Sequence, residues 1–119
     1  MKKTLVLGAS PDSIRFSYKA IKSLLRYGHP IVAVGNKDGE VNGVKIEIGK
    51  PKADKVDTIA LYLNPTKQKE YYDYLISLEP KRIIFNPGTE NKELMDLASK
   101  NGIEVVEDCI LIMLNTDRY

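Results

Sequence analysis

Small residues near the start of the chain have the spacing of a phosphate-binding turn. Gly8, Ala9 and Ser10 follow an apolar run and precede a helical pattern that carries Arg15 and Ser17 in its first turns. The first N–H groups of a helix lack partners and the helix dipole is positive at that end, so such a turn suits an anion. Arg15 could form two bonds to a diphosphate, and Ser17 could donate its hydroxyl. The three glycines of the dinucleotide fingerprint are absent, so the turn predicts a phosphate site without specifying the ligand.

A second candidate group, Gly35, Asn36 and Lys37, ends the next apolar run along the chain. A protein that binds NAD places an acidic residue at this point, where it bonds the ribose hydroxyls. A lysine would instead attract a phosphate on the ribose. The sequence therefore favours a ligand with a phosphorylated ribose, either NADP or coenzyme A. A lysine in a solvated turn would give the same pattern, so that reading stays open.

The chain offers few groups for catalysis. Its only histidine, His29, precedes the second predicted strand and so lies at the amino end of the sheet, opposite the expected ligand face. Its only cysteine, Cys109, excludes an internal disulfide; it could meet a ligand thiol or pack as a small apolar residue. Neither a Walker lysine motif nor metal-ligand spacing of His, Asp and Glu occurs. We therefore expect no enzymatic activity and no metal site.

These residues are connected by apolar runs that alternate with amphipathic stretches. The predicted strands cover residues 4–8, 30–35, 44–48, 58–63, 82–85 and 103–106, and the predicted helices cover residues 13–27, 64–78 and 91–100. A short apolar helix or turn is expected over residues 109–114. Continuous Val, Ile and Leu runs are typical of strands that are covered on both faces. With right-handed crossovers they predict an α/β fold: one Rossmann-like, doubly wound parallel sheet of five to six strands with helices on both faces. The predicted strand order is 3-2-1-4-5, with a sixth strand next to the fifth. We also expect a turn at residues 37–40 and a loose tail from Asn115.

This topology brings the candidate residues together. In doubly wound sheets, ligands bind beyond the carboxyl ends of the strands, where the strand order reverses. That point lies between the first strand and the strand that ends at Leu63. Asn64 and Pro65 follow it as the expected cap and first residue of a helix, and the turn at Gly88 lies beside them. The predicted ligand contacts are Gly8, Ala9, Ser10, Arg15, Ser17, Gly35, Asn36, Lys37, Leu63, Asn64 and Gly88.

Composition sets broad limits on partners and location. The 119 residues are 43% apolar and 29% charged with a formal net charge of +2, which is typical of one soluble domain spanning residues 1–119. The lysines are scattered, so we expect no nucleic-acid partner. The first apolar run is too short for a signal peptide, and no run approaches a membrane span. A cytoplasmic protein is expected. Ile112 and Leu114, apolar residues near the C-terminus, could be buried in a homodimer.

Taken in order, several short motifs resemble one known family, the small CoA-binding domain proteins. They are Gly8–Ser10, Arg15–Tyr18, Leu24–Val34, Val41–Ile46, Phe85–Asn91 and Gly102–Cys109. Each motif is short, but their order and spacing together cover nearly the whole chain. The family has a Rossmann-like fold related to the CoA-binding domain of succinyl-CoA synthetase alpha subunits.

The resemblance assigns roles to the candidate residues. It implies that Gly8–Ser10 and Arg15–Ser17 contact the CoA diphosphate, and that Lys37 lies near the phosphate on the adenosine ribose. Two positions depart from the family pattern. Gly35-Asn36 stands where the family often has Asn-Pro, and Phe85 replaces an aromatic residue that is often Trp.

The combined hypothesis is non-catalytic binding of CoA or an acyl-CoA, held without a covalent bond and with its diphosphate at the first strand–helix turn. Two alternatives stay open. The first is an NADP-binding, reductase-like protein, although neither a substrate domain nor a proton donor is evident. The second is an interaction module that has lost its ligand.

Overall fold

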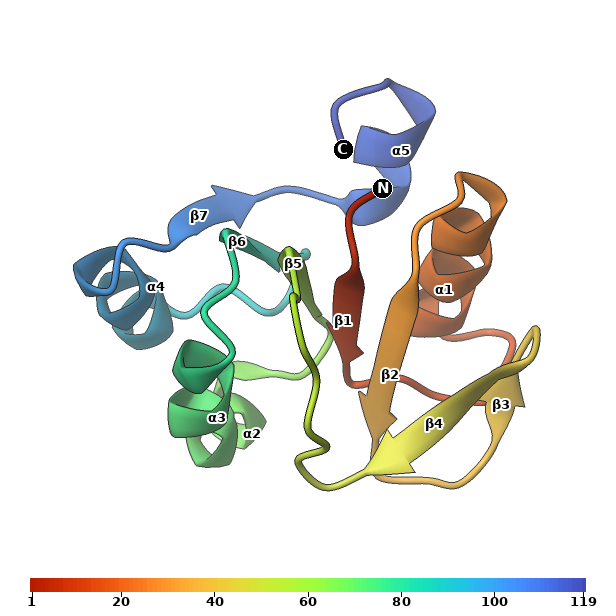
Figure 1. Ribbon diagram of the computed structural model, residues 1–119, viewed down its shortest axis with the longest axis horizontal. Coiled ribbons are helices and arrows are strands. Elements are labelled where there is room, and N and C mark those ends of the chain that lie inside the picture. Colours follow the sequence, from red (N-terminus) through yellow and green to blue (C-terminus); the bar gives the residue numbers. More distant parts are fainter.

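A central sheet organises the structure, a computed structural model that describes residues 1–119 (Figure 1). The seven strands lie in the order β3-β4-β2-β1-β5-β6-β7. In chain order they are β1 (Thr4–Leu7), β2 (Ile31–Gly35), β3 (Glu40–Val41), β4 (Val44–Ile48), β5 (Thr58–Leu61), β6 (Arg82–Phe85) and β7 (Glu104–Glu107). All neighbouring pairs are parallel except β3 with β4. The parallel strands have the predicted order, so the doubly wound, Rossmann-like fold is confirmed.

The edge strand β3 corrects the prediction, because the sequence indicated a turn at residues 37–40 and no strand between that turn and residue 44. Asn42 and Gly43 join β3 to β4 with φ values of 48° and 87°. Positive φ at both positions is the geometry of a two-residue type I′ hairpin, for which Asn-Gly is the preferred pair. The sheet is therefore mixed, with seven strands and one antiparallel pair at its edge, rather than wholly parallel with five to six.

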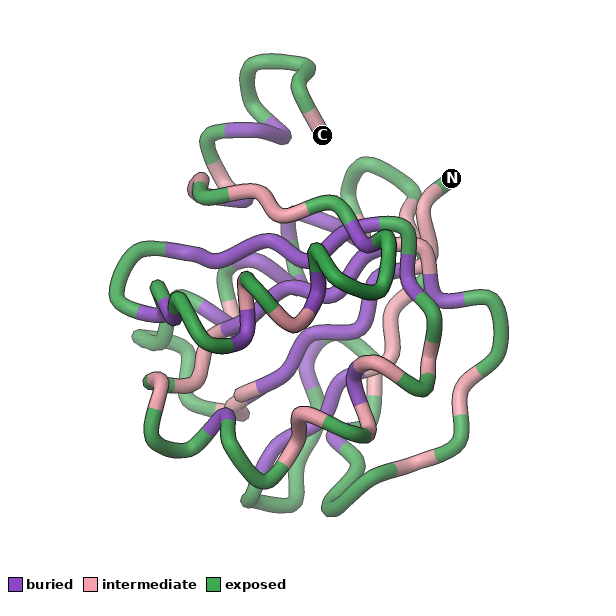
Figure 2. Tube along the Cα trace, turned by 90° about the vertical axis from the view of Figure 1, so that its left-hand side faces the viewer, coloured by how far each residue is buried: buried purple, intermediate pink, exposed green.

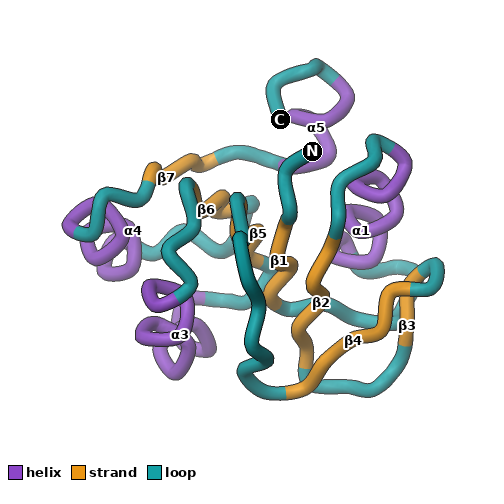
Figure 3. Tube along the Cα trace, in the orientation of Figure 1, coloured by secondary structure: helices purple, strands orange, loops and turns teal.

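Helices cover both faces of the sheet, as predicted (Figures 1 and 3). They are α1 (Phe16–Arg26), α2 (Pro65–Gln68), the 3-10 helix η1 (Lys69–Tyr71), α3 (Tyr72–Ser77), α4 (Lys92–Lys100) and α5 (Ile110–Asn115). Alternate strand residues face opposite layers. Val6 of β1 packs in the cluster that includes α1 and α5, whereas Leu5 and Leu7 pack in the cluster that includes α3 and α4. The buried strands form the centre of the molecule (Figure 2).

Two helices differ from their predicted bounds. The first begins at Phe16 rather than at residue 13, because Asp12 holds the preceding residues in a turn. Its side chain accepts from the Ile14 N–H and its carbonyl from the Arg15 N–H. Arg15 is therefore the N-cap of α1 and does not lie in its first turn. The helix predicted over residues 64–78 is divided into α2, η1 and α3.

The C-terminal segment is not the loose tail that was predicted. The Tyr119 hydroxyl forms a hydrogen bond with Thr4, and the Tyr119 ring centroid lies 4.4 Å from the Arg82 guanidinium carbon. The same ring meets His29 edge-on, with centroids 4.8 Å apart. Arg118 forms a salt bridge to Asp108 with an N–O distance of 2.8 Å. The tail is thus held against the amino edge of the sheet.

The two apolar residues of α5 that were expected at a homodimer interface differ in their exposure. Leu114 is 4% exposed and packs in the core, so it offers nothing to a homodimer. Ile112 is 53% exposed and remains the only one of the two available to a partner. None of the helices has the length and apolar character needed to cross a membrane.

Candidate functional site

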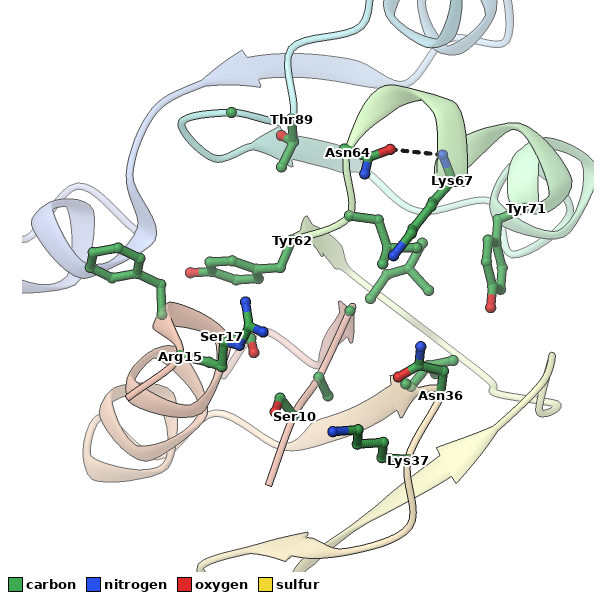
Figure 4. A pocket seen from close by; sticks show the side chains of 18 of the residues that line it. Ser10, Arg15, Ser17, Asn36, Lys37, Tyr62, Asn64, Lys67, Tyr71 and Thr89 are labelled. Carbon is green, nitrogen blue, oxygen red and sulfur yellow. Dashed lines mark hydrogen bonds between the residues drawn. The ribbon is translucent and has the colours of Figure 1, made fainter. Parts of the chain in front are cut away.

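A cavity of about 570 Å³ opens at the carboxyl ends of β1, β2 and β5, where the strand order reverses (Figure 4). Every residue predicted to contact the ligand lines it: Gly8, Ala9, Ser10, Arg15, Ser17, Gly35, Asn36, Lys37, Leu63, Asn64 and Gly88. The structure thus brings together residues from four separate connections of the chain. Their role in binding remains a prediction.

Gly8 and Gly35 let the first turn close against its neighbouring strands. Gly8 has a φ of 97°, and a Cβ on it would lie 2.9 Å from the carbonyl carbon of Tyr62. A Cβ on Gly35 would lie 2.2 Å from the carbonyl oxygen of Ala9, closer than any real Cβ contact. The N–H groups of Gly8 and Ala9 both donate to the Val34 carbonyl oxygen, at 2.8 and 2.9 Å. These residues therefore shape the site, and donors to an anion must come from elsewhere.

The N-terminus of α1 supplies those donors. Arg15, its N-cap, forms no capping hydrogen bond through its side chain, and the first turn contains no acidic residue. The opening N–H groups of the helix therefore have no side-chain acceptor at the cap. The side chain of Ser17 lines the cavity within this turn, and Arg15 extends beside it (Figure 4). In contrast, Asn64 caps α2 and Asn91 caps α4 through side-chain oxygens.

The opposite side of the cavity carries residues that sequence reasoning missed. Lys67 and Glu70 come from α2 and η1, and Tyr71 ends η1. Figure 4 shows Lys67 extending into the cavity on the Tyr71 side, away from Arg15. The salt bridges of the structure involve other residues, so Lys67, Lys37 and Arg15 are all unpaired. One available signal was that Lys67 lies three residues after Asn64, in the first turn of a helix that begins at the site.

Tyr62 is a further lining residue that was missed, and it lies on the Arg15 side of the cavity (Figure 4). Burial is the main cause that raises the pKa of its hydroxyl above the ordinary value, and the nearby Cys109 adds to this. Tyr62 therefore stays protonated at neutral pH and can donate a hydrogen bond. Cys109 itself is half-buried before α5 and does not line the cavity.

Buried amides hold the loops around the cavity in place. The Asn86 side chain donates to the Leu61 carbonyl oxygen at 3.0 Å and accepts from the Ile110 N–H at 2.9 Å. Gln68, fully buried, donates to the carbonyl oxygens of Leu63 and Thr89 at 2.8 and 2.9 Å. These bonds connect the end of β5 to the turn that contains Gly88. They give the motif at residues 85–91 a structural role beside any contact with a ligand.

His29 lies at the other edge of the sheet. Its Nδ1 accepts a hydrogen bond from the Lys2 backbone N–H at 3.0 Å. Burial, followed by the positive charges of the N-terminus, Lys2 and Arg82, lowers its pKa. The histidine therefore belongs to the tail contacts rather than to the cavity.

Comparison with known proteins identifies the family. A sequence model described as a CoA binding domain matches residues 2–115. The chain belongs to this CoA-binding domain family. Among curated proteins, no relative of the sequence is found.

Solved structures share the fold of this chain. A crystal structure of an uncharacterized protein has 50% identity and a TM-score of 0.98, covering 100% of this chain and 98% of its own. A hypothetical protein from Pyrococcus horikoshii OT3 has 29% identity and a TM-score of 0.84, covering 97% and 82%. Cell-free ID.343 from Thermus thermophilus, at 21% identity and a TM-score of 0.86, shares the fold over 99% and 90%.

Proposed function

We propose that this domain binds CoA or an acyl-CoA reversibly, catalyses no reaction, and holds the ligand diphosphate at the N-terminus of α1. The observation that carries the proposal is the uncapped start of this eleven-residue helix, which opens onto the cavity with Arg15 and Ser17 beside it. An anion there meets unpaired N–H groups, the positive end of the dipole and a guanidinium. Membership of the CoA binding domain family supports CoA as the ligand class.

The remaining lining residues suit a nucleotide. Lys37 lies on the connection after β2, where a ribose phosphate is expected, and Tyr71 offers an aromatic ring for a base. Tyr62 offers a hydroxyl donor on the opposite side, toward which the pantetheine arm would extend. The non-catalytic reading is supported by the position of His29, whose Nδ1 is already occupied at the amino edge.

Calorimetric titration with CoA, acetyl-CoA, NADP and NAD tests the proposal. We expect saturable binding of CoA and acetyl-CoA and much weaker binding of both nicotinamide nucleotides. Arg15→Gln should lower CoA affinity by at least about tenfold, because a charged, two-bond contact is lost. The matched control is Arg26→Gln, which removes the same charge from the other end of α1 and should leave affinity unchanged. Preferred binding of NADP would contradict the proposal, as would equal effects of the two substitutions.

A further inference from the structure

An exposed aromatic ring lies at the rim of the cavity, at the start of α1. Phe16, the first residue of this helix, lines the cavity but is 66% exposed. It does not pack against either apolar core cluster of the protein. The Lys19 ammonium lies 5.3 Å from the ring centroid, and this cation–π contact leaves most of the residue exposed. A large apolar side chain is thus open to a group that occupies this end of the cavity.

Tyr62 adds an unused hydrogen-bond donor to the same side of the cavity. Its ring packs against a core cluster, yet its hydroxyl has no hydrogen-bond partner within the chain. By contrast, the Tyr74 hydroxyl donates to the Pro51 carbonyl oxygen at 2.6 Å. Figure 4 shows the Tyr62 hydroxyl pointing away from Lys67, on the side of the cavity where Arg15 lies. A carbonyl oxygen of a ligand on this side would accept from this hydroxyl.

The two ends of the cavity therefore differ in their chemistry. Lys67 and Glu70 line the end next to Tyr71, whereas Tyr62 lies at the end next to the α1 terminus, where Phe16 follows the N-cap. With a diphosphate bound at that terminus, the nucleoside and the flexible arm of CoA leave it in opposite directions. The charged end suits the nucleoside, so the arm runs past Tyr62, whose hydroxyl donates to one of its amide carbonyls. The sulfur end of the arm can then reach the rim that carries Phe16.

We propose that the Phe16 ring binds the acyl group of an acyl-CoA, so that the domain selects acylated CoA over free CoA. The inference rests on the proposed binding of CoA and names the form of CoA that the site takes. Free CoA ends in a thiol and leaves the ring in water, whereas an acyl chain that lies across the ring removes apolar surface of both from water. The affinity should therefore rise with each methylene that contacts Phe16.

Calorimetric titration of the full chain with CoA, acetyl-CoA and hexanoyl-CoA tests the inference. The wild-type protein should bind hexanoyl-CoA at least about tenfold more tightly than CoA, with acetyl-CoA between them. Phe16→Ser should reduce this preference to about twofold or less, because the apolar contact is lost. The matched control is Ile112→Ser, which removes a comparably exposed apolar side chain that does not line the cavity. It should leave the preference unchanged.

The path of the arm is tested by a second variant. Tyr62→Phe removes only the unpartnered hydroxyl and keeps the ring against the core. It should lower the affinities for CoA and hexanoyl-CoA by the same factor, about fivefold, because both ligands carry the amide carbonyls. Unchanged affinities would mean that the arm leaves the diphosphate on another side of the cavity, which overturns the inference.

The outcomes separate this inference from the proposed function. Equal affinities of the wild-type protein for CoA and hexanoyl-CoA would overturn the inference and leave CoA binding intact. A preference that persists in Phe16→Ser would also overturn it, because another surface would then hold the acyl group. So would a wild-type dimer that Phe16→Ser dissociates in sedimentation, since Phe16 would then be an interface between copies. If the wild-type protein bound none of the three ligands, the proposed function would fail and the inference with it. Melting temperatures of Phe16→Ser and Ile112→Ser should match the wild type, because both side chains are exposed.

Discussion

The two edges of the sheet use similar polar residues in opposite ways. At the carboxyl edge, Arg15, Lys37 and Lys67 face a cavity and form no salt bridge. At the amino edge, the Arg82 guanidinium lies against the Tyr119 ring and donates to the Thr58 hydroxyl at 2.8 Å. A cation with partners inside the chain stabilises the fold, whereas one without partners is available to a ligand. Arg82 forms no salt bridge either, so the difference between the edges lies in which cationic side chains have neutral partners inside the chain.

The largest loss of stability should come from a change in the backbone turns at the carboxyl edge. The charged side chains there have no partners, but the turns themselves are closely packed. In Gly35→Ala, the new Cβ would lie 2.2 Å from the Ala9 carbonyl oxygen, which cannot move without breaking the turn. We expect a loss of at least about 3 kcal/mol in the free energy of unfolding, measured by urea denaturation. Gly43→Ala is the control, because its Cβ meets nothing and only its φ of 87° is strained. Equal losses in the two variants would show that the first turn is not packed as described.

The next effect tests whether the amino edge is purely structural. Tyr119→Ala removes the ring that covers Arg82 and the hydroxyl that bonds Thr4. It should lower the free energy of unfolding by about 2 kcal/mol in urea denaturation, through lost apolar burial and the lost cation–π contact. Tyr119→Phe, which keeps the ring, should cost about half as much. CoA affinity should not change in either variant, and a fall in affinity would contradict the separation of the two edges.

A smaller change, this time a gain in stability, is expected from a substitution at the start of α1. Arg15 occupies an extended N-cap position without forming a cap, while Asn64 and Asn91 cap α2 and α4. Arg15→Asn should therefore raise the free energy of unfolding by about 1 kcal/mol, because it supplies an acceptor to the opening N–H groups. The same variant should bind CoA at least about tenfold more weakly in calorimetry. Lower stability together with unchanged affinity would show that this terminus is structural.

Local patterns were sufficient to predict the layers and the location of the cavity. Buried strands such as Thr58–Leu61 are continuous apolar runs, and the carboxyl ends of parallel strands must meet at one edge. The residues that follow them in sequence, such as Asn36 and Asn64, are therefore brought together by topology alone. The Asn42-Gly43 pair carried the signal of a hairpin but was not interpreted as one.

The missed features depend on contacts that no local pattern specifies. Tyr71 lines the cavity from the end of η1, one of the three segments, α2, η1 and α3, into which the predicted single helix is divided. Tyr119 and Thr4 meet across a sequence separation of 115 residues. An aromatic residue at the end of a chain has no periodicity to indicate burial, so its contact with the amino edge could be seen only in three dimensions.

The smallest predicted effect concerns pH at the amino edge. Burial lowers the pKa of His29 below its ordinary value of 6.5, and its Nδ1 accepts from Lys2, which a protonated ring could not do. Below pH 6.5 the unfolded chain therefore binds more protons at this residue than the folded chain, so stability falls as the pH decreases through that range. The melting temperature should decline slightly from pH 7 to pH 5, and His29→Asn should reduce the decline. Because His29 lies opposite the cavity, His29→Asn should leave the pH dependence of CoA affinity unchanged. A parallel change in CoA affinity would mean that the two edges are coupled.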